Sequence, residues 1–173
     1  MEIDVEKAEW FARIKHDGQF RATGDPYIVH PIRVAKILES IKPDSQKLKT
    51  LTAAAYLHDT IEDTDTSFKE LERHFGREVA SIVLELSSAP FASDYSGKEK
   101  YLAAKMLIMT PYALTVKLAD RLDNICDMET FSEEKKLSKF NETLEIIKVL
   151  KESSNITQTQ AKLIDQIERA IGC

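Results

Sequence analysis

The sequence predicts an all-α fold, a helical bundle of about eight to ten helices in a single domain spanning residues 1–173. Only five Gly and five Pro occur among the 173 residues, whereas Ala, Leu, Lys and Glu, which favour helices, are plentiful. Apolar residues recur at helical spacing, and no segment alternates between apolar and polar residues for long enough to require a sheet. A chain of this length can bury a sizeable core.

The composition of the chain argues against two classes of binding partner, nucleic acids and membranes. The formal net charge is −5, so the chain as a whole is not built to coat nucleic acid, and we expect no nucleic-acid partner. No apolar run is long enough to span a bilayer, and the acidic, amphipathic N-terminus is unlike a signal peptide, so we expect no membrane association. Two Cys make no disulfide framework, which favours a reducing, cytoplasmic setting. A homo-oligomer is compatible with the sequence.

The first half of the chain shows several helical segments. His30 precedes Pro31, which suits the first helical position, so we expect His30 at the N-terminus of a helix. Ser67 and Glu70 have the form of a capping box, and Gly76 closes the short helix that they begin. Apolar spacing predicts further helices over 4–16, 46–60 and 77–87.

The second half begins with a loop-like stretch, SSAPFASDYSG at 87–97, which is a candidate lid over a site. Four helices are expected after it, over 98–109, 111–126, 133–151 and 157–171. Residues 133–173 are expected to serve as C-terminal packing helices.

The segment LHDTIEDT at 57–64 concentrates ionisable groups. In a helix, His58 and Glu62 lie one turn apart, and so do Asp59 and Asp63. A solvated acidic helix end would explain the charges alone. The adjacent His-Asp pair behind an apolar run favours a metal site, because imidazole and carboxylate together suit a hydrolytic divalent ion.

A single ion needs ligands from several elements. The candidates are His30, His58, Asp59 and Asp120, two imidazoles and two carboxylates that suit an ion such as Mn²⁺ with open positions for water and substrate. Asn124 lies one turn beyond Asp120 and can reach the same cavity.

Asp120 lies in an apolar stretch, where a carboxylate is costly unless it is paired or bound to a metal. The alternative to metal binding is an ion pair with Lys117 or Arg121, which the sequence leaves open.

Four ordered segments resemble the hydrolase domain of the RelA/SpoT homologue family, whose members are HD-domain metal phosphohydrolases. The similarity runs from about residue 8 to about residue 150, and the segments are HDGQFRATGDPYIVHP, LHDTIEDT, FGREVASIV and VKLADRLDN. The family's synthetase domain has no counterpart in the 173 residues. The resemblance therefore implies a stand-alone small alarmone hydrolase of the Mesh1-like kind, with an HD-type all-α fold and a bound Mn²⁺.

The resemblance also implies a reaction, the hydrolysis of the 3′-pyrophosphate of ppGpp or pppGpp to GDP or GTP and pyrophosphate. Glu62 and Asp63 match the family's catalytic Glu-Asp pair, which would position or deprotonate the water and protonate the leaving oxygen. Helix-end solvation stays open for either residue alone. Arg21, Thr23 and Asn124 match positions that line the family's nucleotide pocket.

Other residues have weaker indications. Lys98 or Lys100 is as compatible with a phosphate contact as with a solvated face. For His16 we favour a helix-end or base-pocket role over metal ligation, and for Tyr27 we favour packing over base stacking.

Departures from the family pattern, such as Ala22 and the segment after Asn124, lie in substrate-facing parts, so they leave the substrate more open than the metal site. Two alternatives to the (p)ppGpp reaction follow. One is an HD-domain phosphatase acting on another nucleotide, for example on the 2′-phosphate of NADPH. The other is a nucleotide sensor without turnover, against which the intact Glu62-Asp63 pair argues.

Overall fold

The computed structural model describes residues 2–88, 98–153 and 155–172, and the regular elements in these ranges are α-helices, which confirms the all-α prediction. The chain divides into two compact units, Met1–Ser87 and Ser88–Cys173. The single-domain organisation therefore stays a prediction. Most of the candidate lid, 89–97, lies outside the described residues. Within the described ranges, the helices are too short or too polar to cross a membrane.

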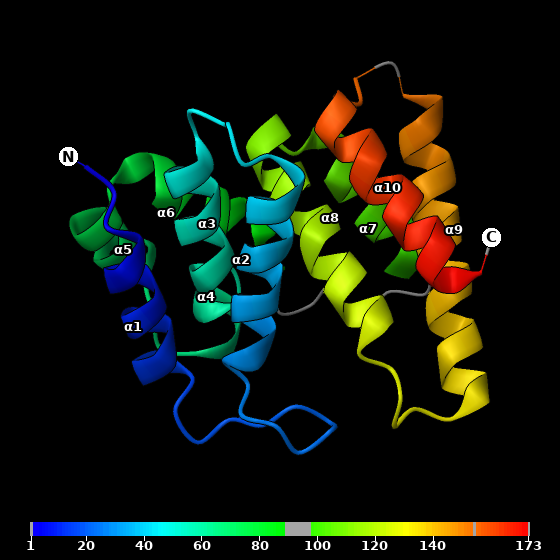
Figure 1. Ribbon diagram of the computed structural model, residues 1–173, viewed down its shortest axis with the longest axis horizontal. Coiled ribbons are helices and arrows are strands. Elements are labelled where there is room, and N and C mark those ends of the chain that lie inside the picture. The colour runs from blue at the N-terminus through cyan, green and yellow to red at the C-terminus, as the bar shows by residue number, and fades with distance from the viewer. Residues whose placement is uncertain (1, 89–97, 154, 173) are drawn as a thin grey trace. The chain divides into compact units, whose positions relative to one another are not determined.

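The first unit is built around one buried helix, α3, which packs against α1, α2 and α6 (Figure 1). Every residue of α3 from Thr50 to Leu57 is buried. The three consecutive alanines, Ala53 to Ala55, expose no surface, so their small side chains let neighbouring helices approach closely. The helices of this unit are α1 Val5–Lys15, α2 Val29–Ile41, α3 Leu48–Leu57, α4 Thr60–Asp63, α5 Phe68–Phe75 and α6 Arg77–Leu86.

The predicted helix over 46–60 is wrong in its extent, because α3 ends at Leu57 and α4 begins at Thr60. Two side chains beyond α3 bind the last carbonyl oxygens of that helix. His58 Nδ1 donates to the Ala55 oxygen at 2.7 Å, and Thr60 Oγ1 donates to the Leu57 oxygen at 2.7 Å. These bonds satisfy buried carbonyls that lack helical partners. The break thus leaves His58 and Asp59 at the end of the central helix.

The turn from α5 to α6 follows its local sequence signals. The Ser67 hydroxyl accepts the Glu70 backbone amide at 3.2 Å, which is one half of the predicted capping box. The Glu70 carboxylate instead pairs with Lys15 at 3.3 Å. Gly76 has φ +83°, a conformation that favours glycine and that lets α6 begin directly after α5.

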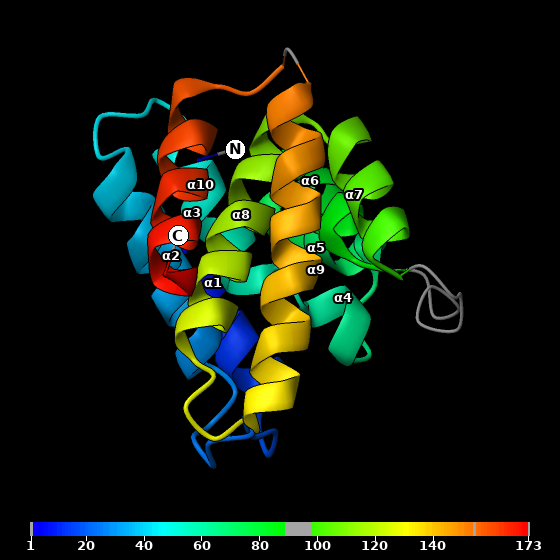
Figure 2. The ribbon, with the colours of Figure 1, turned by 90° about the vertical axis from the view of Figure 1, so that its right-hand side faces the viewer.

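In the second unit, α8 packs against α9 and α10, and α7 packs against α9 (Figure 2). Each of the four helices predicted for this half is present, with ends within one residue of the predicted ones. They are α7 Lys98–Ile108, α8 Pro111–Cys126, α9 Glu133–Glu152 and α10 Gln158–Ile171. Hydroxyl caps precede three of them, contributed by Thr110, Ser132 and Thr157.

Gln160 links the start of α10 to the start of α8. Its side-chain oxygen accepts the Thr157 amide at 2.8 Å, which completes a capping box with the Thr157 hydroxyl. Its side-chain nitrogen donates to the Pro111 oxygen at 2.9 Å and lies 3.3 Å from Thr115 Oγ1. Gln160 exposes no surface, so its amide group depends wholly on these protein partners.

The variant Gln160→Ala should lower the free energy of unfolding by about 2–3 kcal/mol, because it removes one half of a cap and a buried hydrogen bond between two helices. Urea unfolding followed by circular dichroism measures the change. Gln166→Ala, at an exposed position of the same helix, is the matched control and should change stability by no more than about 0.5 kcal/mol. Equal effects of the two variants would contradict the role assigned to Gln160.

Candidate metal centre

The first unit brings together His30, His58 and Asp59, three of the four predicted metal ligands. His30 lies in the first turn of α2, and the other two residues lie between α3 and α4. The distance from His30 Nε2 to His58 Nε2 is 3.2 Å, and Asp59 Oδ2 lies 2.9 Å from His58 Nε2 and 3.7 Å from His30 Nε2. Both imidazoles are buried, with 1% of each side chain exposed, whereas Asp59 retains 17% exposure. Two nitrogen atoms and one oxygen atom therefore face one point.

The hydrogen bond between His58 and the Ala55 carbonyl oxygen holds the imidazole in a tautomer that can bind a cation through Nε2. A carbonyl oxygen only accepts, so His58 Nδ1 carries the proton that it shares with Ala55. In the neutral imidazole, Nε2 then presents a lone pair toward the carboxylate oxygen of Asp59 at 2.9 Å. Two acceptors at this distance repel each other unless a proton or a metal ion lies between them. A backbone carbonyl that fixes the tautomer in this way is also the usual partner of a metal-binding histidine.

Asp63 lies one helical turn after Asp59, and its backbone amide donates to the Asp59 oxygen at 2.9 Å. Partial burial raises the pKa of Asp63, and the like charges of Asp59 and Glu62 add to that rise. A hydrogen bond from Tyr27 acts in the opposite direction. Glu62 and Asp63 are both exposed at the surface of the unit. The centre thus has two solvent-accessible carboxylates within one turn of a predicted ligand.

Arg21 and Thr23 lie in the loop before α2, which an isolated bridge between Phe20 and Pro26 closes. The Arg21 guanidinium lies 5.8 Å from the centre of the Tyr27 ring. Thr23 Oγ1 donates to Asp25 Oδ2 at 3.0 Å, within the loop. The structure therefore places Arg21, of these two predicted substrate residues, against an aromatic ring near the centre.

The fourth predicted ligand, Asp120, belongs to the second unit, where it lies on α8 with 7% of its side chain exposed. Asn124 Nδ2 donates to Asp120 Oδ1 at 2.5 Å, so the predicted one-turn relation of these residues is present. Lys117 Nζ lies 2.8 Å from Asp120 Oδ2. The ion pair that the sequence offered as an alternative to metal binding is therefore formed, and Asp120 by itself does not require a metal.

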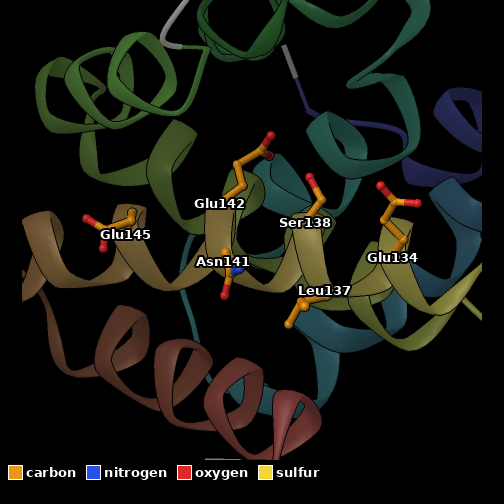
Figure 3. A pocket seen from close by; sticks show the side chains of 6 residues that line it. All are labelled: Glu134, Leu137, Ser138, Asn141, Glu142 and Glu145. Atoms are coloured by element: carbon orange, nitrogen blue, oxygen red, sulfur yellow. The ribbon is translucent and has the colours of Figure 1, made fainter.

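Arg121, the other alternative partner, faces α9 instead. Its guanidinium binds Glu142 at 3.2 Å and the Thr143 hydroxyl at 2.9 Å. A cavity of about 510 Å³ runs along the same helix. Figure 3 shows its lining residues, which are Glu134, Leu137, Ser138, Asn141, Glu142 and Glu145. The three carboxylates in this lining would repel the negative charge of a polyphosphate, so this cavity is a poor candidate for binding one. Lys100 is exposed, and the side chain of Lys98 lies outside the described residues.

Sequence reasoning missed the polar role of Tyr27. Its hydroxyl donates to Asp59 Oδ2 at 2.6 Å and lies 3.3 Å from Asp63 Oδ2. Its ring lies 4.7 Å from that of His16, which ends α1 as the sequence predicted. The sequence contained one sign of this role, because Tyr27 precedes the predicted ligand His30 by only three residues. In the structure, the Tyr27 carbonyl oxygen accepts the His30 amide at 3.0 Å.

Known proteins resemble this chain over most of its length. Guanosine-3′,5′-bis(diphosphate) 3′-pyrophosphohydrolase of Aquifex aeolicus is 38% identical over 152 residues, which cover 83% of this chain and 20% of that protein. GTP pyrophosphokinase of Myxococcus xanthus is 37% identical over 169 residues, which cover 93% of this chain and 22% of that protein. The chain thus spans about a fifth of the length of these curated relatives.

A solved structure resembles the whole chain. It belongs to a metazoan ortholog of SpoT that is described as hydrolyzing ppGpp and playing a role in starvation responses. The TM-score is 0.80 and the identity 25%, and the match covers 97% of this chain and 95% of that one. The model of the HD domain family matches residues 8–153, which include His30, the segment from His58 to Asp63, and Asp120, and the chain therefore belongs to the HD domain family.

Proposed function

We propose that this protein hydrolyses the 3′-pyrophosphate of ppGpp or pppGpp in a reaction that depends on a divalent metal, giving GDP or GTP and pyrophosphate. The convergence of His30, His58 and Asp59 beside Glu62 and Asp63 supports the chemistry most directly. The identity of the substrate is inferred from the relatives. The main support is the metazoan protein that matches the chain along nearly its whole length and is described as hydrolyzing ppGpp.

The proposed ligands are His30, His58, Asp59 and Asp120, and the proposed ion is Mn²⁺. Two imidazoles and two carboxylates form a mixed nitrogen and oxygen set, which suits Mn²⁺ and leaves coordination positions open. When bound, such an ion lowers the pKa of water and offsets the negative charge of the phosphate. Asp120 would have to exchange the ammonium group of Lys117 for the ion, since the two side chains are 2.8 Å apart in the structure.

Glu62 and Asp63 are proposed to handle the protons. Hydrolysis needs one group that takes a proton from the attacking water and one that gives a proton to the leaving oxygen. Both carboxylates are exposed in the helical turn that follows Asp59, where substrate and water can reach them. The hydrogen bond from the Asp63 amide to the Asp59 carbonyl oxygen fixes the backbone of Asp63 relative to a proposed ligand.

Three side chains are proposed to recognise the nucleotide. The Arg21 guanidinium can pair with a phosphate or stack on the base, and its place over the Tyr27 ring limits its motion. Asn124 presents an amide beside Asp120, suited to a ribose or phosphate oxygen. Thr23 supplies a hydroxyl in the loop that carries Arg21.

Purified protein incubated with ppGpp and Mn²⁺ should release GDP and pyrophosphate in equal amounts, and removal of the metal by a chelator should abolish the release. Chromatography of the nucleotide and an enzymatic assay for pyrophosphate measure both products. Release of orthophosphate would indicate a phosphatase acting on another bond. If the protein binds Mn²⁺ and ppGpp yet forms no product, the proposed reaction is wrong.

Replacing Glu62 by Gln, or Asp63 by Asn, should lower kcat by about 10²- to 10⁴-fold, because each variant loses a proton-transfer group while keeping the shape of the side chain. Mn²⁺ affinity should change little. Steady-state kinetics with ppGpp measures the effect. Asp65→Asn is the matched control, an exposed carboxylate of the same segment that pairs with Lys15. Retention of wild-type kcat by both Glu62 and Asp63 variants would exclude the assigned roles.

The variant Asp120→Asn should weaken Mn²⁺ binding by at least about 10-fold, since it replaces a charged ligand by a neutral one. Titration calorimetry with Mn²⁺ measures the affinity. Asp165→Asn, at an exposed position of α10, is the control and should leave binding unchanged. If the Asp120 variant binds Mn²⁺ as the wild type does, then Asp120 is only the ion-pair partner of Lys117.

A further inference from the structure

We propose that Tyr27 is a positioning residue of the metal centre, whose hydroxyl orients the Asp59 carboxylate toward His30 and His58. The inference depends on the metal-binding part of the proposed function and is independent of the identity of the nucleotide. It starts from a single oxygen atom, Asp59 Oδ2, on which the Tyr27 hydroxyl and both imidazole nitrogens converge.

The geometry of the hydroxyl identifies Asp59 as its main partner. At 2.6 Å, the Tyr27–Asp59 contact has the length of a strong hydrogen bond from a hydroxyl to a charged oxygen. The distance of 3.3 Å to Asp63 Oδ2 is longer than a hydroxyl bond usually is. A phenol has one proton to donate, so that proton goes to Asp59.

The bond from Tyr27 is compatible with an ion at the same oxygen. A carboxylate oxygen accepts at two lone-pair positions, and Tyr27 takes one of them. The other faces His58 Nε2 at 2.9 Å and His30 Nε2 at 3.7 Å. Because 17% of the Asp59 side chain is exposed, the carboxylate is also within reach of solvent. Tyr27 therefore selects the orientation in which Oδ2 points at the two imidazoles.

Tyr27 is itself held firmly, as a positioning residue must be. Its backbone amide donates to the Gln19 oxygen at 2.9 Å, and its carbonyl oxygen accepts the His30 amide at 3.0 Å. Its ring contacts those of His16 at 4.7 Å and His30 at 5.9 Å between centroids. The backbone bond to His30 connects the loop directly to a proposed ligand.

Gln19 extends the support to the other side of the centre. Its side-chain nitrogen donates to the Asp63 backbone oxygen at 2.9 Å, and its side-chain oxygen lies 2.8 Å from His16 Nδ1. The loop before α2 and the turn after α3 are thus linked at two points, through Tyr27 to Asp59 and through Gln19 to Asp63, and Tyr27 also binds the backbone of His30 at the start of α2. Loss of the Tyr27 hydroxyl removes only the first link and leaves the ring in place.

The test compares Tyr27→Phe with wild type, first by calorimetric titration of the metal-free protein with Mn²⁺ and then by kinetics with ppGpp. The dissociation constant for Mn²⁺ should rise by about 10- to 100-fold, the usual cost of losing a partner of a metal ligand. At Mn²⁺ concentrations that saturate the variant, KM for ppGpp should stay near the wild-type value while kcat recovers with added metal.

Tyr56→Phe is the matched control, because Tyr56 belongs to the same unit and its variant likewise loses a hydroxyl that bonds to a carboxylate, that of Glu9. The calorimetric stoichiometry separates unfolded protein, which lowers the number of sites, from weakened sites, which raise the dissociation constant. Unchanged Mn²⁺ affinity in Tyr27→Phe, equal weakening in both variants, or no Mn²⁺ binding by wild type would each overturn the proposal. Mn²⁺ binding without ppGpp hydrolysis would refute the proposed reaction, while the titrations would still decide the role of Tyr27.

Discussion

The hydrogen bond from His58 Nδ1 to the Ala55 carbonyl is the contact on which the first unit most depends. Buried carbonyls at the end of α3 require donors, so polar side chains have to follow that helix. The same bond fixes which imidazole nitrogen carries the proton, and it turns Nε2 toward Asp59 and His30. Termination of the central helix and presentation of a ligand are therefore one interaction, and a residue without a donor at position 58 would lose both.

The alanines of α3 explain how a second ligand reaches this point. Because Ala53, Ala54 and Ala55 expose no surface, neighbouring helices approach the end of α3 closely, and α2 is one of them. His30 lies in the first turn of α2, where its Nε2 comes within 3.2 Å of His58 Nε2. Small side chains in the core thus determine the distance between two groups that carry the chemistry.

The helix boundaries could be predicted from the sequence where they depend only on residues close by in the chain. Hydroxyl caps at Thr110, Ser132 and Thr157 begin α8, α9 and α10 within one residue of the predicted positions, because a cap depends only on nearby backbone. The break at 58–59 was missed, since apolar periodicity continues through it and the bonds that cause it are made by side chains to buried carbonyls. The hydroxyl role of Tyr27 was missed for a similar reason, because its partner Asp59 is 32 residues away.

The ion pair between Lys117 and Asp120 gives the second unit a cation of its own. If Asp120 binds a divalent ion as proposed, that ion competes with an ammonium group tethered one turn away, and its measured affinity is what remains after the ammonium group has been displaced. Such a competitor would lower the apparent affinity for the ion, and where no ion is bound the ammonium group neutralises the Asp120 carboxylate on α8.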